Sequence, residues 1–133
     1  PIRTLAARIR EVSNAYGLPL DPDRLVGDLS AGERQRVEIV RCLLGNPRLL
    51  IMDEPTSVLT PQEAEGLFVV LRRLAANGLG VIFISHKLGE VLSVSHRILV
   101  LREGSIVAAF QRGEANQERL LGIASRPTTE VAA

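Results

Sequence analysis

A short apolar run in the middle of the chain ends in two adjacent carboxylates and a proline. Residues Leu49 to Met52 favour a buried strand, Asp53 and Glu54 follow at its end, and Pro55 prevents a helix from starting there. Because a residue before proline is pushed out of the helical region, we expect Glu54 to stay extended. The sequence therefore predicts a strand whose tip carries two acids, which suits Mg²⁺ and a water molecule, although a solvated strand end is the simpler alternative.

Helix and strand signals alternate along the rest of the chain. The expected helices cover residues 2–16, 31–44, 61–76, 88–94 and 116–124, and the expected strands cover residues 48–52, 80–85, 97–101 and 105–110. The alternation predicts a parallel sheet with covered faces, and Glu103-Gly104 predicts a tight turn into an antiparallel edge hairpin. The first helix is expected to be amphipathic, with Ile2, Leu5, Ile9, Val12 and Tyr16 at helical spacing, and Gly17 is expected to end it in a left-handed conformation. Thr60 is expected to cap the helix 61–76, and a frayed tail is expected after residue 124.

Composition bounds the class of protein. The 133 residues are enough for one domain, and 46% apolar residues with a mean hydropathy of +0.17 predict a packed core. Sixteen basic and fifteen acidic residues give no electrostatic footprint for nucleic acid or an anionic membrane. Cys42 is the only cysteine, which excludes an internal disulfide, and we expect it to be buried in its helix. No apolar run approaches the roughly 20 residues of a membrane helix.

Two further blocks carry chemistry. Ser30-Ala31-Gly32-Glu33 opens a helix, where Ser-x-x-Glu is a capping box and the free N–H groups also form an anion site that Gly32 leaves open. Both interpretations can hold together. His86 ends the strand 80–85, either as an ordinary polar strand end or as a group that contacts a phosphate, whereas His96 is expected to be ordinary surface.

These three blocks, in this order, resemble the second half of an ATP-binding cassette (ABC) ATPase domain, from about Ile2 to Phe110. The resemblance implies an α/β fold: a truncated P-loop ATPase core with a mostly parallel sheet, helices and an antiparallel edge hairpin, plus part of the helical signature subdomain. It assigns residues 1–47 to that subdomain, residues 48–112 to the core sheet, and residues 113–133 to a C-terminal helix and tail.

The resemblance also implies roles for single residues. Asp53 holds Mg²⁺, Glu54 orients and deprotonates the attacking water, and His86 contacts the γ-phosphate. The residues that contact the nucleotide of a partner domain are Ser30, Ala31, Gly32 and Glu33, and the D-loop is formed by Ser57, Val58, Leu59 and Thr60. The chain departs from the family pattern in having Ala31 for glycine, Glu33 for glutamine and Thr60 for aspartate.

One motif of the family has no match. The Walker A pattern Gly-x-x-x-x-Gly-Lys-Ser/Thr is absent, because the only lysine, Lys87, follows His86. Since the chain also begins at Pro1, we expect it to be a fragment that is inactive alone. In the family the Walker A strand lies between the strands matching 80–85 and 97–101, so we expect these strands to pair directly, or the slot to be filled by another molecule or by the chain's own ends.

The function implied by the resemblance is ATP binding and hydrolysis in an ABC importer that takes up a small solute, a sugar or nucleoside. The implied cofactors are Mg²⁺ and ATP in the intact parent. The implied partners are a second ATP-binding domain, transmembrane permease subunits and a periplasmic or extracellular solute-binding protein, with no nucleic acid, at the cytoplasmic face of the cell membrane. Two alternatives stay open: a soluble ABC ATPase of DNA repair or translation, and a non-catalytic interaction module.

Overall fold

The computed structural model describes residues 1–124, which fall into two compact units that meet between Ile84 and Ser85. This break lies inside the segment 48–112 that the sequence assigned to one core sheet. The assignment of residues 1–47, 48–112 and 113–133 to three parts stays a prediction.

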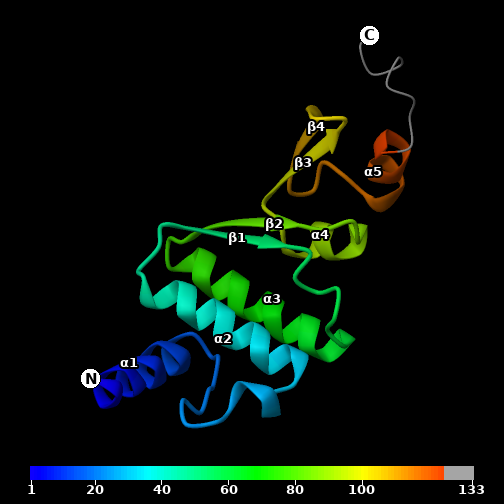
Figure 1. Cartoon of the computed structure of the whole chain (residues 1–133). Coiled ribbons are helices and arrows are strands. Elements are labelled where there is room, and N and C mark those ends of the chain that lie inside the picture. The colour runs from blue at the N-terminus through cyan, green and yellow to red at the C-terminus, as the bar shows by residue number, and fades with distance from the viewer. Residues whose placement is uncertain (125–133) are drawn as a thin grey trace. The chain divides into compact units, whose positions relative to one another are not determined.

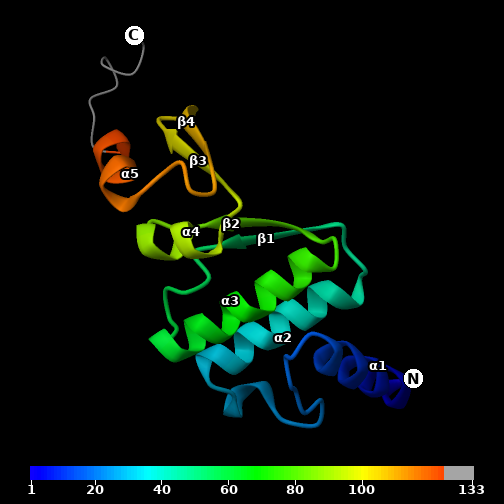
Figure 2. The ribbon, with the colours of Figure 1, turned by 180° about the vertical axis from the view of Figure 1, so that it is seen from behind.

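The first unit contains three long helices and a two-stranded parallel sheet (Figure 1). Its elements are α1 (Ile2–Ala15), the 3₁₀ turn η1 (Val26–Asp28), α2 (Ala31–Leu44), β1 (Leu49–Asp53), α3 (Pro61–Ala76) and β2 (Gly80–Ile84). The strands pair in register from Leu49 opposite Gly80 to Asp53 opposite Ile84, so both carboxyl ends lie at the same edge. Helices α2 and α3 run along one side of this sheet, and α1 packs on α2 (Figures 1 and 2).

The core of the first unit is formed by the buried apolar faces of β1, α2 and α3. Its members are Leu50, Met52, Ile39, Val40, Leu43, Ala64, Leu67, Phe68, Val70, Leu71 and Leu74, with Leu18 from the loop after α1. The ring of Phe83 meets Phe68 edge to face, with centroids 5.9 Å apart. The expected helices 31–44 and 61–76 and the left-handed Gly17, with φ of 69°, are confirmed.

The other face of the parallel sheet is open, which the sequence did not predict. Leu50 and Met52 point into the core, while their neighbours Leu49 and Ile51 are 50% and 60% exposed. Ile82 and Ile84 of β2 are likewise exposed. The expectation of covered faces is therefore wrong for one face, because the described residues of this unit place helices on one side only.

The second unit is an antiparallel hairpin packed with two helices, and it contains α4 (Leu88–Val94), β3 (Arg97–Arg102), β4 (Ser105–Gln111) and α5 (Gln117–Ala124). Its core is formed by Ile98, Phe110 and Leu120. Glu103 and Gly104 both have positive φ, 48° and 79°, which is the geometry of a type I′ turn. The predicted hairpin is confirmed.

One prediction about the sheet is wrong, namely that the third strand belongs to the parallel sheet. In the described part of the chain β2 pairs only with β1 and β3 pairs only with β4, so the third strand does not extend the parallel sheet. Direct pairing of β2 with β3 is therefore wrong, and the described ends of the chain are helices that supply no filling strand. Filling by a strand of another molecule stays a prediction.

Three smaller expectations concern exposure and the chain end. Cys42 is exposed on α2, so the expectation of a buried cysteine is wrong. The first helix is amphipathic in sequence, but Ile2 and Leu5 on its apolar side are 86% and 53% exposed, whereas Ser13 is buried. The expected tail lies outside the described residues. Among residues 1–124, none of the helices has the length and apolar character that crossing a membrane requires.

Candidate functional site

The start of α2 has the geometry that the Ser-x-x-Glu pattern predicts. The Glu33 backbone N–H donates to Ser30 Oγ at 3.2 Å, and the Ser30 N–H donates to Glu33 Oε2 at 2.7 Å, which closes a capping box. Arg24 Nη1 lies 2.9 Å from Glu33 Oε1. The bond from the Ser30 backbone N–H, assisted by Arg24, lowers the pKa of Glu33 below its ordinary value.

The remaining first-turn amides of α2 are suited to an anion. The N–H groups of Ala31 and Gly32 belong to the first turn of α2, where a helix offers them no carbonyl acceptor. The positive end of the helix dipole lies at the same place. Ser30 and Ala31 are exposed, whereas Gly32 is buried. The segment can therefore present the Ser30 hydroxyl and the Ala31 N–H to a phosphate outside the chain. Gly32, which was expected to leave the anion site open, is instead covered by the Glu63 side chain.

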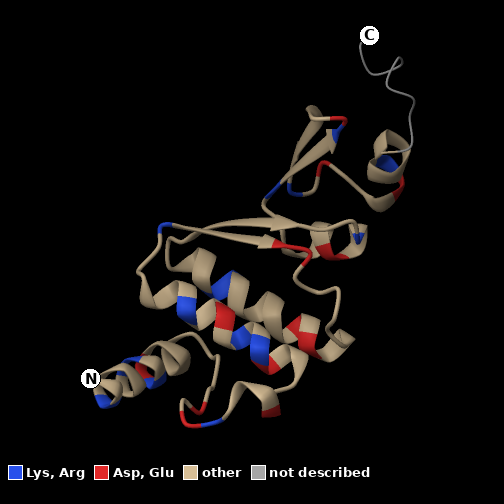
Figure 3. Cartoon of the chain, in the orientation of Figure 1, with Lys and Arg blue, Asp and Glu red and all other residues tan. Residues whose placement is uncertain are grey.

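The two acids lie at the carboxyl end of β1, marked in red in Figure 3. Asp53 is the last strand residue and is exposed. Glu54 has a φ of 48°, so the expectation that it stays extended is wrong. Its N–H donates to the Ile84 carbonyl at 2.8 Å, and its own carbonyl accepts the Ser57 N–H at 3.3 Å, so the chain turns at Glu54. A left-handed backbone at a residue other than glycine destabilises the fold by about 1–3 kcal/mol. Such strained residues are found most often at functional sites.

The loop after the acids is anchored on one side and exposed on the other. Pro55 and Thr56 are buried, with Thr56 only 1% exposed. The Leu59 N–H donates to the Thr56 carbonyl at 3.2 Å, while Val58 is 70% exposed. Thr60 Oγ1 accepts the Glu63 N–H at 3.2 Å and so caps α3, as the sequence predicts.

His86 belongs to the second unit and follows Ile84 by two residues. Its side chain is exposed. The turn around it is organised by Ser85, whose Oγ accepts the Lys87 N–H at 3.0 Å. The catalytic, nucleotide-binding and metal-binding roles assigned to His86 and to the residues of the first unit stay predictions.

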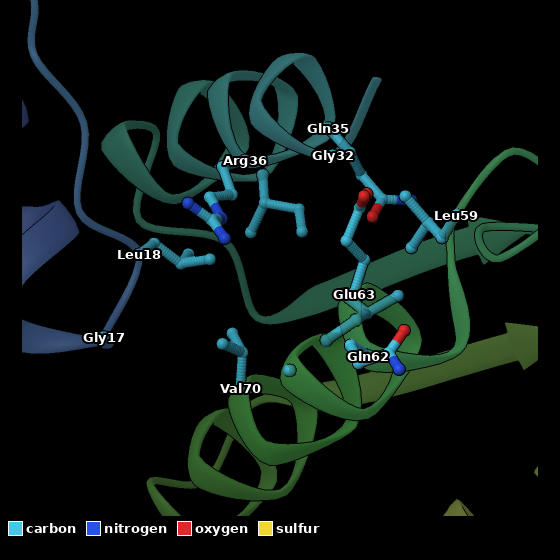
Figure 4. A pocket seen from close by; sticks show the side chains of 12 residues that line it. Gly17, Leu18, Gly32, Gln35, Arg36, Leu59, Gln62, Glu63 and Val70 are labelled. Atoms are coloured by element: carbon cyan, nitrogen blue, oxygen red, sulfur yellow. The ribbon is translucent and has the colours of Figure 1, made fainter. Parts of the chain in front are cut away.

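Two residues near this site were not singled out from the sequence. Gln35 Nε2 donates to the Pro55 carbonyl, which ties α2 to the loop that follows the acids. The carboxylate of Glu63 lies against Gly32, and both residues line a cavity of about 320 Å³ between α2 and α3 (Figure 4). A signal did exist, because Gly32, Gln35 and Arg36 share one helix face by their spacing of three and four residues.

The carboxylates at the strand tip fit one kind of metal site. Across residues 1–124 no three His, Cys, Asp or Glu side chains gather as a ready-made set of ligands. Mg²⁺ is commonly held by one or two carboxylates, several waters and the phosphates of a substrate. Asp53 can supply the protein part of such a site, and the remaining ligands would come from nucleotide and water.

A parallel sheet with acids at its carboxyl end is the arrangement in which α/β folds commonly bind ligands. A family profile described as "ABC transporter" matches residues 4–57. The chain resembles the ATP-binding domains of ABC transporters.

Curated relatives agree with this assignment. The chain is 42% identical over 119 residues to "Ribose import ATP-binding protein RbsA 1" of Burkholderia ambifaria, covering 90% of this chain and 23% of the relative. It is 40% identical over 119 residues to "Nucleoside import ATP-binding protein NupA" of Lactococcus lactis, covering 90% of this chain and 24% of that protein. The chain thus spans about a quarter of the length of these relatives.

Solved structures agree on the fold. A nucleotide-free ATP-binding cassette from an ABC transporter matches 96% of this chain with a TM-score of 0.75 and 28% identity, and 49% of that cassette is covered. A metal-chelate-type ABC transporter in an inward-facing conformation matches 91% of the chain with a TM-score of 0.78 at 24% identity, which bears on the fold alone. The predicted ABC-type α/β fold is confirmed.

Proposed function

We propose that these residues form part of the ATP-binding and ATP-hydrolysing subunit of an importer for a small solute, a sugar or a nucleoside. The observation that carries the proposal is the pair Asp53 and Glu54 at the end of β1, with Glu54 held in a left-handed conformation beside the end of β2. The names of the relatives, ribose import and nucleoside import proteins, support the solute class and favour an importer over a DNA-repair or translation ATPase.

In this proposal each site residue has one task. Asp53 takes part in holding Mg²⁺, which when bound neutralises phosphate charge, and Glu54 accepts a proton from the attacking water. Ser30 and the first-turn amides of α2 contact the ATP of a second ATP-binding domain, and the exposed segment 57–60 faces that domain. His86 contacts the terminal phosphate. The further partners are transmembrane permease subunits and a solute-binding protein, at the cytoplasmic face of the membrane.

The proposal is tested first by Glu54→Gln in a complete cassette that contains these 133 residues. The amide keeps the shape of the side chain but cannot accept the proton, so hydrolysis should fall about 10²-fold to 10⁴-fold while ATP still binds. Phosphate release and equilibrium ATP binding are the measurements. Glu65→Gln, an exposed carboxylate on α3, is the matched control and should hydrolyse at the parent rate. Unchanged hydrolysis in Glu54→Gln would make the acids a solvated strand end.

A second test uses the 133-residue chain itself. Because it contains no Walker A segment, titration calorimetry with Mg-ATP should show no saturable binding at micromolar nucleotide. A micromolar dissociation constant would contradict this expectation and would mean that the phosphate site lies elsewhere in the chain.

A further inference from the structure

Gly32 is packed against a carboxylate of its own chain. A Cβ atom placed on Gly32 would lie 2.2 Å from Glu63 Oε2, closer than two such atoms can approach, and 3.0 Å from Glu63 Cδ, which is a tight contact. Gly32 is buried in the first turn of α2 and has ordinary helical backbone, which any residue can adopt. The glycine therefore leaves room for the end of the Glu63 side chain, which a larger residue at this position would have to displace.

The carboxylate that fills this space is in an unusual environment. Glu63 Oε2 is buried and has no hydrogen-bond partner among the described residues. Burying a polar atom without a hydrogen bond is costly, so some other interaction must compensate. Glu63 is the third residue of α3 and its carboxylate rests on the first turn of α2, so the positive ends of two helix dipoles lie near one negative charge.

A second glycine shows that this contact is specific. Gly66 lies one turn further along α3 and lines the same cavity, yet nothing lies within 4 Å of a Cβ placed on it. Glycine in a helix is less favourable than alanine by roughly 1 kcal/mol. At Gly66 no contact opposes a replacement, whereas at Gly32 the Glu63 carboxylate does.

We propose that Glu63 is a positioning residue that sets the start of α2 against the start of α3. Its carboxylate occupies the place of the side chain that Gly32 lacks, and the two residues form a matched pair. Because α2 begins with Ser30 and Ala31, and α3 begins directly after the segment 57–60, the pair fixes the distance between these two segments. The consequence for ATP contact rests on the function proposed above; the packing itself does not.

The proposal is tested by a mutant cycle on the 133-residue chain, read as the urea midpoint of unfolding. Gly32→Ala should lower the midpoint in the parent, because Glu63 must leave its place. In the Glu63→Ala background the same change should raise the midpoint, since only the better helix propensity of alanine remains. In the Glu63→Gln background, which keeps the shape, Gly32→Ala should again lower it. The control Gly66→Ala should raise the midpoint in all three backgrounds.

An effect of Gly32→Ala with the same sign and size in the parent and in Glu63→Ala would overturn the pairing. Positioning has its own readout, the distance between spin labels on native Cys42 of α2 and on Glu65→Cys of α3, both exposed sites. Glu63→Ala should shift or broaden this distance distribution, and Glu63→Gln should leave its mean in place. An unchanged distribution in Glu63→Ala would refute the positioning role. No readout here uses nucleotide, so failure of the proposed ATPase function would leave these results interpretable.

Discussion

The two long helices of the first unit begin with the same pattern and use it differently. Helix α2 follows Ser30 with Glu33 at its third position, and α3 follows Thr60 with Glu63 at its third position. In both, the hydroxyl accepts the N–H of the glutamate at 3.2 Å. Only at α2 does the glutamate side chain return to the cap residue, because Glu63 instead rests on Gly32 of the other helix. The hydroxyl caps the N–H three residues along its own helix in both cases, whereas the position of the carboxylate depends on the tertiary packing around it.

Helices α2 and α3 contribute side chains to the same core. Leu74 of α3 is completely buried, so Leu74→Ala should lower the free energy of unfolding of the first unit by about 2–5 kcal/mol. Val69→Ala on the exposed side of α3 is the control and should change it by no more than about 0.5 kcal/mol. Urea unfolding followed by circular dichroism measures both. A loss under about 1 kcal/mol for Leu74→Ala would indicate that α3 is not packed as described.

The hydroxyl caps should be equivalent. Ser30→Ala and Thr60→Ala should each reduce stability by about 1 kcal/mol, because each removes one acceptor from a first-turn N–H. The replacements Ser30→Thr and Thr60→Ser keep the hydroxyl and serve as controls with a smaller loss. The same unfolding experiment applies. If either alanine variant were as stable as its control, the hydroxyl at that position would not stabilise its helix, and the two helix starts would be similar in sequence only.

Glu33, the carboxylate that caps α2, should make a pH-dependent contribution to the free energy of unfolding that is smaller than the effects above. The pKa of Glu33 is lowered in the folded state by the Ser30 N–H and Arg24. Its contribution to stability is therefore complete above the unfolded-state value of about 4.3 and disappears as the pH falls through the folded-state value. The stability difference between the parent and Glu33→Gln should thus be present at neutral pH and shrink in acid.

Arg24→Gln is the partner variant for this measurement. Arg24→Gln removes a lesser cause of the lowered Glu33 pKa. It should therefore reduce the stability lost between neutral and acid pH, in the same direction as Glu33→Gln but by less. Unfolding midpoints measured in a pH series test both variants. A difference between parent and Glu33→Gln that grew as the pH fell would contradict the capping role, because the sign would be reversed.

Much of the fold could be predicted because its signals are local. Both hydroxyl caps, the helix 61–76, the left-handed Gly17 and the Glu103-Gly104 turn depend on interactions within a few residues, and all are confirmed. The order of the three motif blocks was enough to identify the family, which the comparisons confirm. The roles of the site residues stay predictions.

Other features were decided by contacts between residues distant in sequence. Glu54 is left-handed because the carbonyl of Ile84, on another strand, receives its N–H, and the rule for a residue before proline says nothing of that strand. The hairpin of β3 and β4 was predicted from its turn, but the alternation of helix and strand did not reveal that, among residues 1–124, β3 pairs with β4 alone and does not extend the parallel sheet. The pairs Gln35 with Pro55 and Glu63 with Gly32 span twenty and thirty-one residues, and only the packed helices bring them together. The sequence by itself determined where helices α2 and α3 begin, because hydrogen bonds within their first turns decide that, while the tertiary structure decided which elements and side chains meet.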